Sequence, residues 1–372
     1  MYNHSVFKLF YLSKKINVTT LNSFSKTIVA WYKKNKRDLS WRSTRDPYLI
    51  WLSEIILQQT RVEQGLPYFE NFSSGLPNIL KFATASEHDI LKMWQGLGYY
   101  SRARNMHKAA KEILTVYNGA FPKTFVELKQ LKGVGDYTAA AIASFAYNLP
   151  HAVVDGNVYR LLSRYFGIDT PIDTPKGKKE FAKLAGELLD KKNAALHNQA
   201  IMEMGALICK PKKPECEVCP LLAGCSAFEN NTIASLPVKL KKTLVRNRYF
   251  YYLVFKAENK LIINHRSAND IWKNMYDLPL IETNKKMNLE KVLSSVQFQS
   301  RVRNIDFLIR KVSEPIIHKL SHQHLHTVFI VLECKDLPTT DGTQKVVEIK
   351  NLVKYAFPKL IENFLMEEQL LF

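Results

Sequence analysis

The pattern of apolar and polar positions changes its period once along the chain. Between residues 20 and 225 apolar residues recur every three or four positions, which is the period of an amphipathic helix. Glycine and proline separate the segments that carry this period. The segments are "WLSEIILQQTRVEQ", "ASEHDILKMWQ", "SRARNMHKAAKEILTVY", "AAAIASFAY", "NVYRLLSRYFG" and "KKEFAKLAGELLDKK". The pattern therefore predicts a mostly α-helical region.

Beyond residue 248 the period is two. "RYFYYLVFKAENKLIINHRS" predicts a hairpin that turns at "AENK", and "HTVFIVLECK" predicts another strand. The intervening "SAFENNTIASLPVKLKKTLVRNR" has one acidic and five basic residues, which favours an exposed linker. We therefore expect a helical domain over residues 20–225, a basic interdomain linker over 226–247 and a smaller α+β domain over 248–372. The 372 residues suit two domains at about 150 residues each.

The net positive charge of the chain indicates the kind of partner that it binds. The chain has 53 Lys and Arg against 34 Asp and Glu, a net charge of +19, so a polyanion such as a nucleic acid is a natural partner. Solubility is the simpler explanation of such an excess. The first twenty residues lack the uninterrupted apolar core of a signal peptide, and no later segment is long enough to span a bilayer. We expect a soluble, intracellular protein.

Four of the five cysteines lie close together in the sequence. Cys209, Cys216, Cys219 and Cys225 have the spacing CX6CX2CX5C, whereas Cys334 stands alone as an expected buried thiol. Four thiolates hold either a tetrahedral zinc ion or a 4Fe-4S cluster. Structural zinc usually divides its ligands into two CX2C pairs, and here there is one. The unequal spacing therefore favours 4Fe-4S, with zinc as the alternative.

A glycine turn adds a second candidate site. In "LKGVGDYTAA", residues 131–140, Gly133 and Gly135 predict a tight turn whose amides bind an anion such as a phosphate. This turn, "VVDGNVYRLLSR" at 153–164 and the cysteine run, in that order, resemble the helix-hairpin-helix DNA glycosylases with a 4Fe-4S loop. Two relatives compete: the endonuclease III type, a bifunctional remover of damaged pyrimidines, and the MutY family, which excises adenine mispaired with guanine or 8-oxoguanine.

Three features favour the MutY family. "WLSEIILQQTRV" is similar to the MutY segment that contains the catalytic glutamate, and a second domain with "KLSHQHLH" follows the cysteines. Tyr137 occupies the position at which the bifunctional relatives carry a lysine, and a phenol with its usual pKa of about 10 cannot form an imine. The resemblance implies a monofunctional adenine DNA glycosylase of base excision repair: bacterial, cytoplasmic and nucleoid-associated, monomeric, and bound to duplex DNA that contains A:8-oxoguanine or A:G. A non-catalytic DNA-binding protein is the remaining alternative.

The resemblance assigns catalytic roles to four residues. Glu54 is the expected general acid, donating a proton toward N7 of adenine. Asp155 would stabilise the oxocarbenium ion that forms on the sugar, with Asn157 hydrogen-bonding beside it. Tyr137 would contact the reacting nucleotide.

Simpler structural roles are open for three of these residues. Glu54 would form a solvated polar stripe with Gln58 and Arg61, at positions i, i+4 and i+7 of one helix. Asp155 would cap the helix that follows it, and Tyr137 would be a core aromatic at a helix start.

The resemblance also implies DNA contacts. Gln59 matches the residue that fills the gap left by a flipped nucleotide, and Tyr99 matches the aromatic that stacks beside 8-oxoguanine. The turn residues Lys132, Gly133 and Gly135 are expected phosphate contacts.

The second domain resembles Nudix hydrolases in fold but lacks their acidic helix motif. Ser321 and His322 match the 8-oxoguanine-reading loop, with Leu320 in place of the family's phenylalanine. The neighbouring histidines, at 318, 324 and 326, leave a metal site as an alternative. The terminal "EEQLLF" faintly resembles a sliding-clamp peptide, for which a frayed helix is the alternative. The fold class expected is thus a mostly α helix-hairpin-helix glycosylase with a 4Fe-4S loop, plus a Nudix-like α+β domain.

Overall fold

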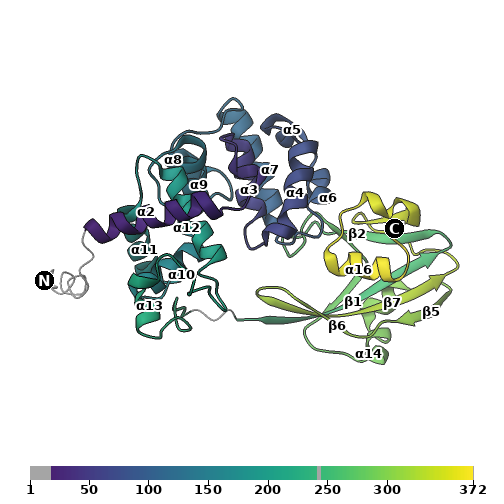
Figure 1. Ribbon diagram of the computed structural model, residues 1–372. Helices are drawn as coiled ribbons and strands as arrows, with labels where there is room; N and C mark the ends of the chain where they lie inside the picture. Colours follow the sequence, from purple (N-terminus) through teal and green to yellow (C-terminus); the bar gives the residue numbers. More distant parts are fainter. Residues whose placement is uncertain (1–17, 241–243, 372) are drawn as a thin grey trace, which may run out of the picture. The chain divides into compact units, whose positions relative to one another are not determined.

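A computed structural model describes residues 18–240 and 244–371 (Figure 1). The first 17 residues, linker residues 241–243 and Phe372 lie outside the described residues. The described residues divide into two compact units, the first formed by 18–83 together with 108–240, the second by 84–107 together with 244–371.

Helices make up nearly all the regular structure before the linker. In chain order they are α2 (Val18–Asn35), η1 (Ser40–Arg42), α3 (Pro47–Ile56), α4 (Val62–Gly75), α5 (Ile79–Thr84), α6 (Glu87–Met93), α7 (Ser101–Val116), α8 (Phe125–Gln130), α9 (Asp136–Tyr147), α10 (Gly156–Phe166), α11 (Pro175–Leu188), α12 (Ala194–Leu207), η2 (Leu222–Gly224) and α13 (Ser226–Glu229). The predicted mostly α-helical region is therefore confirmed.

One predicted helix is wrong in its extent. "WLSEIILQQTRVEQ" is not continuous, because α3 ends at Ile56 and residues 57–61 form a turn before α4. Gln59 in this turn has φ 58°, a left-handed conformation that an α-helix cannot contain. The polar stripe expected of Glu54, Gln58 and Arg61 therefore does not exist as a helix face.

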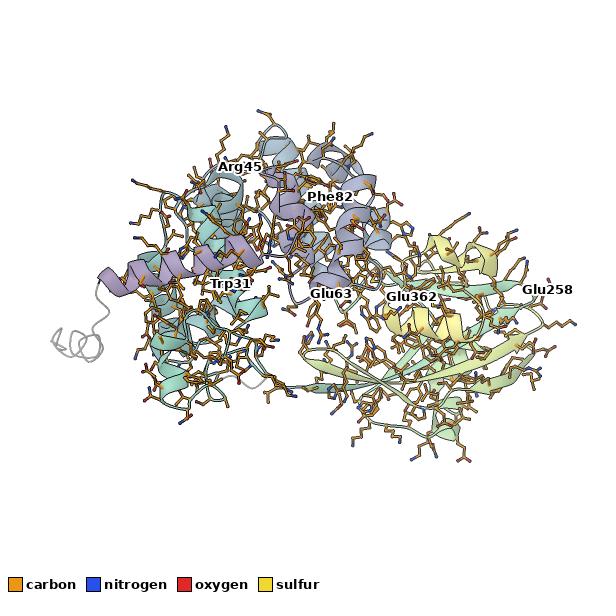
Figure 2. All side chains as sticks on the ribbon, in the orientation of Figure 1. Trp31, Arg45, Glu63, Phe82, Glu258 and Glu362 are labelled. Atoms are coloured by element: carbon orange, nitrogen blue, oxygen red, sulfur yellow. The ribbon has the colours of Figure 1, made fainter. Side chains whose placement is uncertain are left out.

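Helix α9 is the most deeply buried helix around the site. Every residue from Thr138 to Ala146 is buried, and five of these nine are alanines. Small side chains let backbones approach closely, and α9 packs against α3, α8 and α12. Aromatic residues fill the core beside α3: Trp51 and Phe82 are fully buried, with ring centroids 5.5 Å apart. Phe82 is labelled in Figure 2. This packing places the N-terminus of α9 beside α3.

The first part of the expected linker is not exposed. Leu236 is buried, and the Val238 carbonyl accepts a hydrogen bond of 3.1 Å from Ile172 N. The buried guanidinium of Arg164 donates to the carbonyls of Ile233 and Leu236, each at 3.1 Å. The expectation of an exposed segment is therefore wrong over this part, because backbone carbonyls here satisfy a buried arginine.

The second unit is built on an eight-stranded sheet. Its order is β3-β2-β1-β7-β5, with β4 on β1, β6 on β7 and β8 on β2. The elements are β1 (Arg246–Ala257), β2 (Lys260–His265), β3 (Tyr276–Asp277), β4 (Leu280–Thr283), α14 (Leu289–Leu293), α15 (Val296–Arg301), β5 (Phe307–Val312), β6 (Ile316–Lys319), β7 (Gln323–Cys334), β8 (Gln344–Glu348), η3 (Ile349–Lys354) and α16 (Lys359–Glu367).

Two sequence predictions for this unit are confirmed. Ala257 pairs with Lys260 across the β1–β2 hairpin, as expected for a turn at "AENK". β7 contains the strand predicted from "HTVFIVLECK", and it pairs with β1 in parallel. Helix α16 covers the sheet through Phe364, whose ring stacks on Phe329 with centroids 3.9 Å apart.

Residues 84–107 were expected in the helical domain, yet they belong to the second compact unit. The side-chain amide of Gln95 donates to Glu362 Oε1 at 2.6 Å, and Lys92 Nζ donates to the Tyr355 carbonyl at 3.1 Å. Helix α6 thus contacts the C-terminal part of the chain. Within the described residues, no helix combines the length and apolarity needed to cross a membrane.

Candidate active site

The four expected catalytic residues line one cavity of the first unit. The cavity has a volume of about 710 Å³, and Glu54 on α3, Tyr137 on α9, and Asp155 and Asn157 at the start of α10 all border it. These residues come from segments up to 103 positions apart, and the packing of α3 against α9 brings the first two together.

Glu54 and Tyr137 form a hydrogen-bonded pair. The Tyr137 hydroxyl donates to Glu54 Oε2 at 2.6 Å. Burial raises the pKa of Glu54 to about 7, with a contribution from Asp155, although the Tyr137 bond and Arg42 oppose the rise. Burial and the nearby carboxylates of Glu54 and Asp155 raise the pKa of Tyr137 well above its usual value. The pair therefore consists of a neutral phenol donor and a carboxyl group poised to hold or release a proton near neutral pH.

Asp155 is fixed at the N-terminus of α10. Its Oδ1 accepts from the backbone N–H groups of Asn157 at 2.9 Å and Val158 at 2.8 Å, and its Oδ2 accepts from the Asn157 side chain at 2.7 Å. The expected helix cap is thus present. Burial raises the pKa of Asp155, while these bonds and Arg160 oppose the rise. The result is a rigid carboxyl group on the cavity wall.

Arg160 sets the orientation of Asn157. Its Nη2 donates to Asn157 Oδ1 at 2.8 Å and to the Gly205 carbonyl at 2.7 Å. An arginine only donates, so the amide oxygen faces Arg160 and the amide nitrogen faces Asp155. A side chain at Gly205 would place its Cβ 2.8 Å from the Asn157 carbonyl oxygen, which is too close. Sequence reasoning missed both Arg160 and Gly205, although a glycine inside "MEMGAL" was a visible signal.

A buried ion-pair cluster lines the same cavity and was also missed. Glu203, which is fully buried, accepts hydrogen bonds from Arg37 at 2.7 Å and from Arg42 at 2.6 Å. Burial favours the neutral form of Glu203, but the two guanidinium groups outweigh it and lower its pKa to about 2. Two arginines against one carboxylate leave this wall positive. Trp41 and Gln199 complete it.

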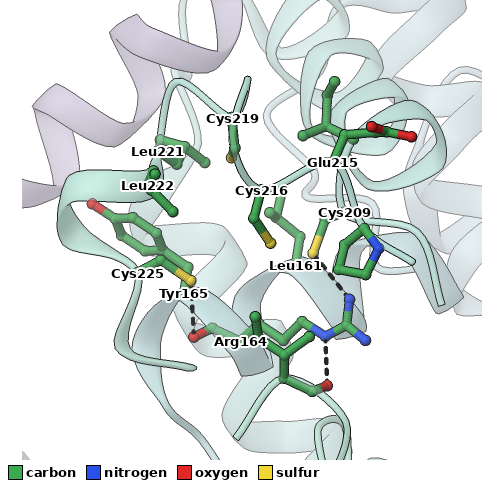
Figure 3. A pocket seen from close by; sticks show the side chains of 13 residues that line it. Leu161, Arg164, Tyr165, Cys209, Glu215, Cys216, Cys219, Leu221, Leu222 and Cys225 are labelled. Atoms are coloured by element: carbon green, nitrogen blue, oxygen red, sulfur yellow. Dashed lines mark hydrogen bonds between the residues drawn. The ribbon is translucent and has the colours of Figure 1, made fainter. Parts of the chain in front are cut away.

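The four clustered cysteines line a second cavity of the first unit (Figure 3). Arg164 Nη1 contacts Cys209 Sγ at 3.5 Å, and the Cys225 thiol contacts the Arg164 carbonyl at 3.7 Å. Burial, with the neighbouring thiols, raises the pKa of Cys219 to about 11, so the thiolates need a shared cationic centre. Among the described residues, no three His, Cys, Asp or Glu side chains meet as ligands of one ion. The four thiols line one cavity, with an N–H donor toward one sulfur, and this donor set fits either a zinc ion or a 4Fe-4S cluster.

The glycine turn needs glycine at only one of its two positions. Gly133 has φ 82°, in the left-handed region, whereas Gly135 is extended with φ −96° and is the N-cap residue of α9. Within this turn positive φ is therefore required at Gly133 alone. Lys132 and both glycines are exposed, so the first amides of α9 are accessible to an anion.

Gln59 and Tyr99 share an unusual backbone. Both are exposed and left-handed, with φ 58° and 49°. Such a conformation in a non-glycine residue costs about 1–3 kcal/mol and is concentrated at functional sites. Gln59 belongs to the first unit, whereas Tyr99 belongs to the second.

Ser321 and His322 form the exposed tip of the β6–β7 turn. The turn is closed by a hydrogen bond of 2.7 Å from Leu320 N to the Gln323 carbonyl. Ser321 Oγ lies 3.2 Å from His322 Nδ1. Of the nearby histidines, His326 stacks on Tyr249.

Comparison with known proteins agrees with both units. Residues 52–188 match the family model described as HhH-GPD superfamily base excision DNA repair protein, and residues 250–367 match the NUDIX domain. The adenine DNA glycosylase of Buchnera aphidicola subsp. Schizaphis graminum is 33% identical over 350 residues, covering 93% of this chain and 99% of the relative. The human adenine DNA glycosylase is 37% identical over 220 residues, covering 57% of this chain and 40% of the relative.

Solved structures match the helical part of the chain. A thermostable thymine-DNA glycosylase has a TM-score of 0.54 at 29% identity, covering 57% of this chain and 100% of that one. A non-covalent endonuclease III–DNA complex has a TM-score of 0.51 at 20% identity, covering 58% of this chain and 98% of that one, and shares the fold.

Proposed function

Because this chain belongs to the adenine DNA glycosylases of the helix-hairpin-helix base excision repair superfamily, we propose that it hydrolyses the N-glycosidic bond of adenine mispaired with 8-oxoguanine or guanine, without cutting the strand. It acts as a DNA repair glycosylase on DNA. The observation that carries the finer proposal is the hydrogen bond between Tyr137 and Glu54 in a cavity that also holds Asp155.

The cavity supports a division of labour between two carboxyl groups. Adenine leaves the sugar readily only after its ring is protonated, and Glu54, with a pKa of about 7, supplies that proton to N7. Asp155, fixed by Asn157 and the first amides of α10, stabilises the positive charge that develops on the sugar, and water completes hydrolysis. Adenine must first leave the base stack, at a cost of a few kcal/mol.

The absence of strand cutting follows from Tyr137. A lyase needs an amine that attacks the sugar, and the residue two positions after the glycine turn is a phenol hydrogen-bonded to the general acid. Two lysines also border the cavity: Lys210, which is ion-paired to Glu215 at 2.6 Å, and Lys212. Borohydride trapping tests all of these amines together, and we expect no abundant covalent DNA adduct.

Recognition of the base opposite adenine is proposed for the second unit. Tyr99, Ser321 and His322 are exposed and belong to the same compact unit, so one body carries a stacking ring and a polar turn. Gln59 would fill the space left by the flipped nucleotide, and Lys132 with the amides of Gly133 and Gly135 would hold a phosphate.

Cys209, Cys216, Cys219 and Cys225 are proposed to hold a 4Fe-4S cluster that stabilises the loop they lie in. The hydrolysis does not pass through it. A visible absorption band near 400 nm and iron bound by the purified protein test this ligand set, because zinc sites are colourless. A colourless protein loaded with zinc would contradict the proposal.

Other finer features are proposed on the same basis. We propose a monomer with a catalytic domain over 20–225, of which residues 84–107 belong to the second compact unit, a linker over 226–247 and an 8-oxoguanine-recognition domain over 248–372. We propose that it is located in the bacterial cytoplasm at the nucleoid. The clamp-like tail offers little to a sliding clamp while it is folded, because Leu370 and Leu371 are each 8% exposed.

The decisive experiment offers duplexes that contain A:8-oxoguanine, A:G, A:C or thymine glycol, followed by alkali. Alkali cuts the strand at an abasic site, so we expect alkali-dependent cleavage at adenine opposite 8-oxoguanine and opposite guanine. Cleavage at thymine glycol without alkali would instead indicate the bifunctional pyrimidine class, and no cleavage of any duplex would indicate a DNA-binding protein without catalysis.

A further inference from the structure

A chain of hydrogen bonds runs from the interior of the second unit to the exposed turn. It begins at Arg248 on β1, which is 6% exposed. All five N–H groups of its guanidinium are used: Asp270 accepts at 2.9 and 2.7 Å, Glu282 accepts two at 2.7 Å, and Gln323 Oε1 accepts at 3.1 Å. A fully satisfied buried arginine has one orientation, so it is a rigid starting point.

Gln323 connects this arginine to the tip of the turn. It is the first residue of β7 and is 9% exposed. Arg248 can only donate, so the amide oxygen of Gln323 must face it and the amide nitrogen must face outward. That nitrogen lies 2.9 Å from His322 Nε2.

The orientation of Gln323 fixes which groups donate and which accept in the hydrogen bonds to His322 and Ser321. The amide nitrogen of Gln323 can only donate, so His322 Nε2 must accept and a neutral ring carries its proton on Nδ1. Nδ1 lies 3.2 Å from Ser321 Oγ and donates to it. One lone pair of Ser321 is thereby occupied, and its hydroxyl proton is left to point away from His322. The backbone supports this geometry, because Arg246 N donates to the His322 carbonyl at 3.0 Å.

We propose that Gln323, held by Arg248, is a positioning residue that keeps the proton of neutral His322 on Nδ1. The Ser321 hydroxyl then points outward and donates to a carbonyl oxygen on the base opposite adenine. The inference rests on the proposed function, since 8-oxoguanine carries a carbonyl oxygen at C8 that guanine lacks. Neither Gln323 nor Arg248 needs to touch DNA. Their effect is to remove the alternative ring tautomer, in which Nδ1 would accept and draw the serine proton inward.

Gln323→Glu is the sharpest test. A carboxylate at 323 still accepts from Arg248, so the buried network is preserved, but it also accepts from His322 and moves the ring proton to Nε2. The ¹⁵N spectrum of histidine-labelled full-length protein at about pH 8.5, where an ordinary imidazole is neutral, shows which nitrogen carries the proton. His322→Gln assigns the signal. We expect Nδ1 protonation in the native chain and Nε2 protonation in Gln323→Glu.

Binding supplies the functional measurement. With a non-hydrolysable adenine analogue, we expect Gln323→Glu and Gln323→Leu to reduce the preference for 8-oxoguanine over guanine about five- to tenfold, the value of one hydrogen bond. Ser321→Ala should lose a similar factor, and adding Gln323→Leu to it should cost little more, because both act through one contact. Gln299→Ala, an exposed glutamine on α15, is the matched control and should change nothing.

The outcomes separate the two proposals. A native His322 proton on Nε2, or a tautomer change in Gln323→Glu without loss of preference, would overturn the relay. A native protein that binds the two duplexes equally would instead overturn the assigned ligand, whatever the ring proton does, whereas one that excises adenine from neither duplex would refute the proposed function.

Discussion

Replacing Tyr137 with phenylalanine should raise the pKa of the general acid and extend activity toward alkaline pH. Glu54 has a pKa of about 7 in the presence of the 2.6 Å bond from Tyr137. That bond favours the carboxylate, so its loss favours the protonated acid. A hydrogen bond to a charged group contributes about 1.5–3 kcal/mol, and 1.36 kcal/mol corresponds to one pKa unit. Because Glu54 borders an open cavity, we take the low end, a rise of about one unit.

The assay is the pH profile of adenine excision with the enzyme below its dissociation constant, which reports the free enzyme. A general acid is active when protonated, so the native rate should be flat below pH 7 and fall about tenfold per unit above it. The alkaline limb of Tyr137→Phe should lie about one unit higher. When each rate is divided by the low-pH plateau of the same protein, the variant should be about eightfold more active than the native protein at about pH 8.5.

Tyr147→Phe is the matched control. It lies on the same helix, and its hydroxyl donates to the Phe121 carbonyl at 3.4 Å, away from the cavity residues. Its profile should coincide with the native one. A limb in Tyr137→Phe that stays in place or moves to lower pH would refute the assignment of Glu54 as the group whose protonation limits the rate. A lower plateau with a shifted limb would leave the assignment intact and measure the orienting contribution of Tyr137.

Three further predictions follow from the site. Glu54→Gln should abolish excision. Because the pKa of Glu54 is raised from 4.5 to about 7, the stability of the native protein falls as pH rises between these values, so denaturant unfolding should show Glu54→Gln more stable at pH 8, by at most about 3 kcal/mol, and equally stable below pH 4. No difference in stability between the variant and the native protein at either pH would contradict the burial of this carboxyl group. Asp155→Asn should bind mispaired DNA in a gel-shift assay yet lose excision, and retained excision would exclude its electrostatic role. Gly205→Ala should lower both the melting temperature and the rate of excision, because the new Cβ clashes with Asn157. Gly186→Ala on α11, where no atom lies near the new Cβ, is the control and should stabilise the protein by up to about 1 kcal/mol. An unchanged melting temperature and excision rate in Gly205→Ala would show that Asn157 tolerates displacement.

The sequence by itself determined the features that depend on neighbouring residues. The helical period, the hairpin at "AENK" and the presence of a strand in "HTVFIVLECK" follow from local pattern, and the structure confirms them, although β7 begins earlier, at Gln323. The cysteine spacing and the glycine turn likewise identify two candidate sites, because their residues are close in the chain. Tyr137 could be distinguished from lysine without any coordinates.

Only the tertiary structure decided the contacts between distant segments. Tyr137 and Glu54 are 83 positions apart, so neither their bond nor the raised pKa of the acid is visible in a local pattern. The apolar period continues through residues 57–61, yet α3 ends at Ile56 and Gln59 in the following turn is left-handed. Residues 84–107 have the same helical period as their neighbours, yet their polar side chains find partners beyond residue 270. Periodicity reports which face of an element is buried, whereas the partner that buries it is fixed only when the whole chain packs.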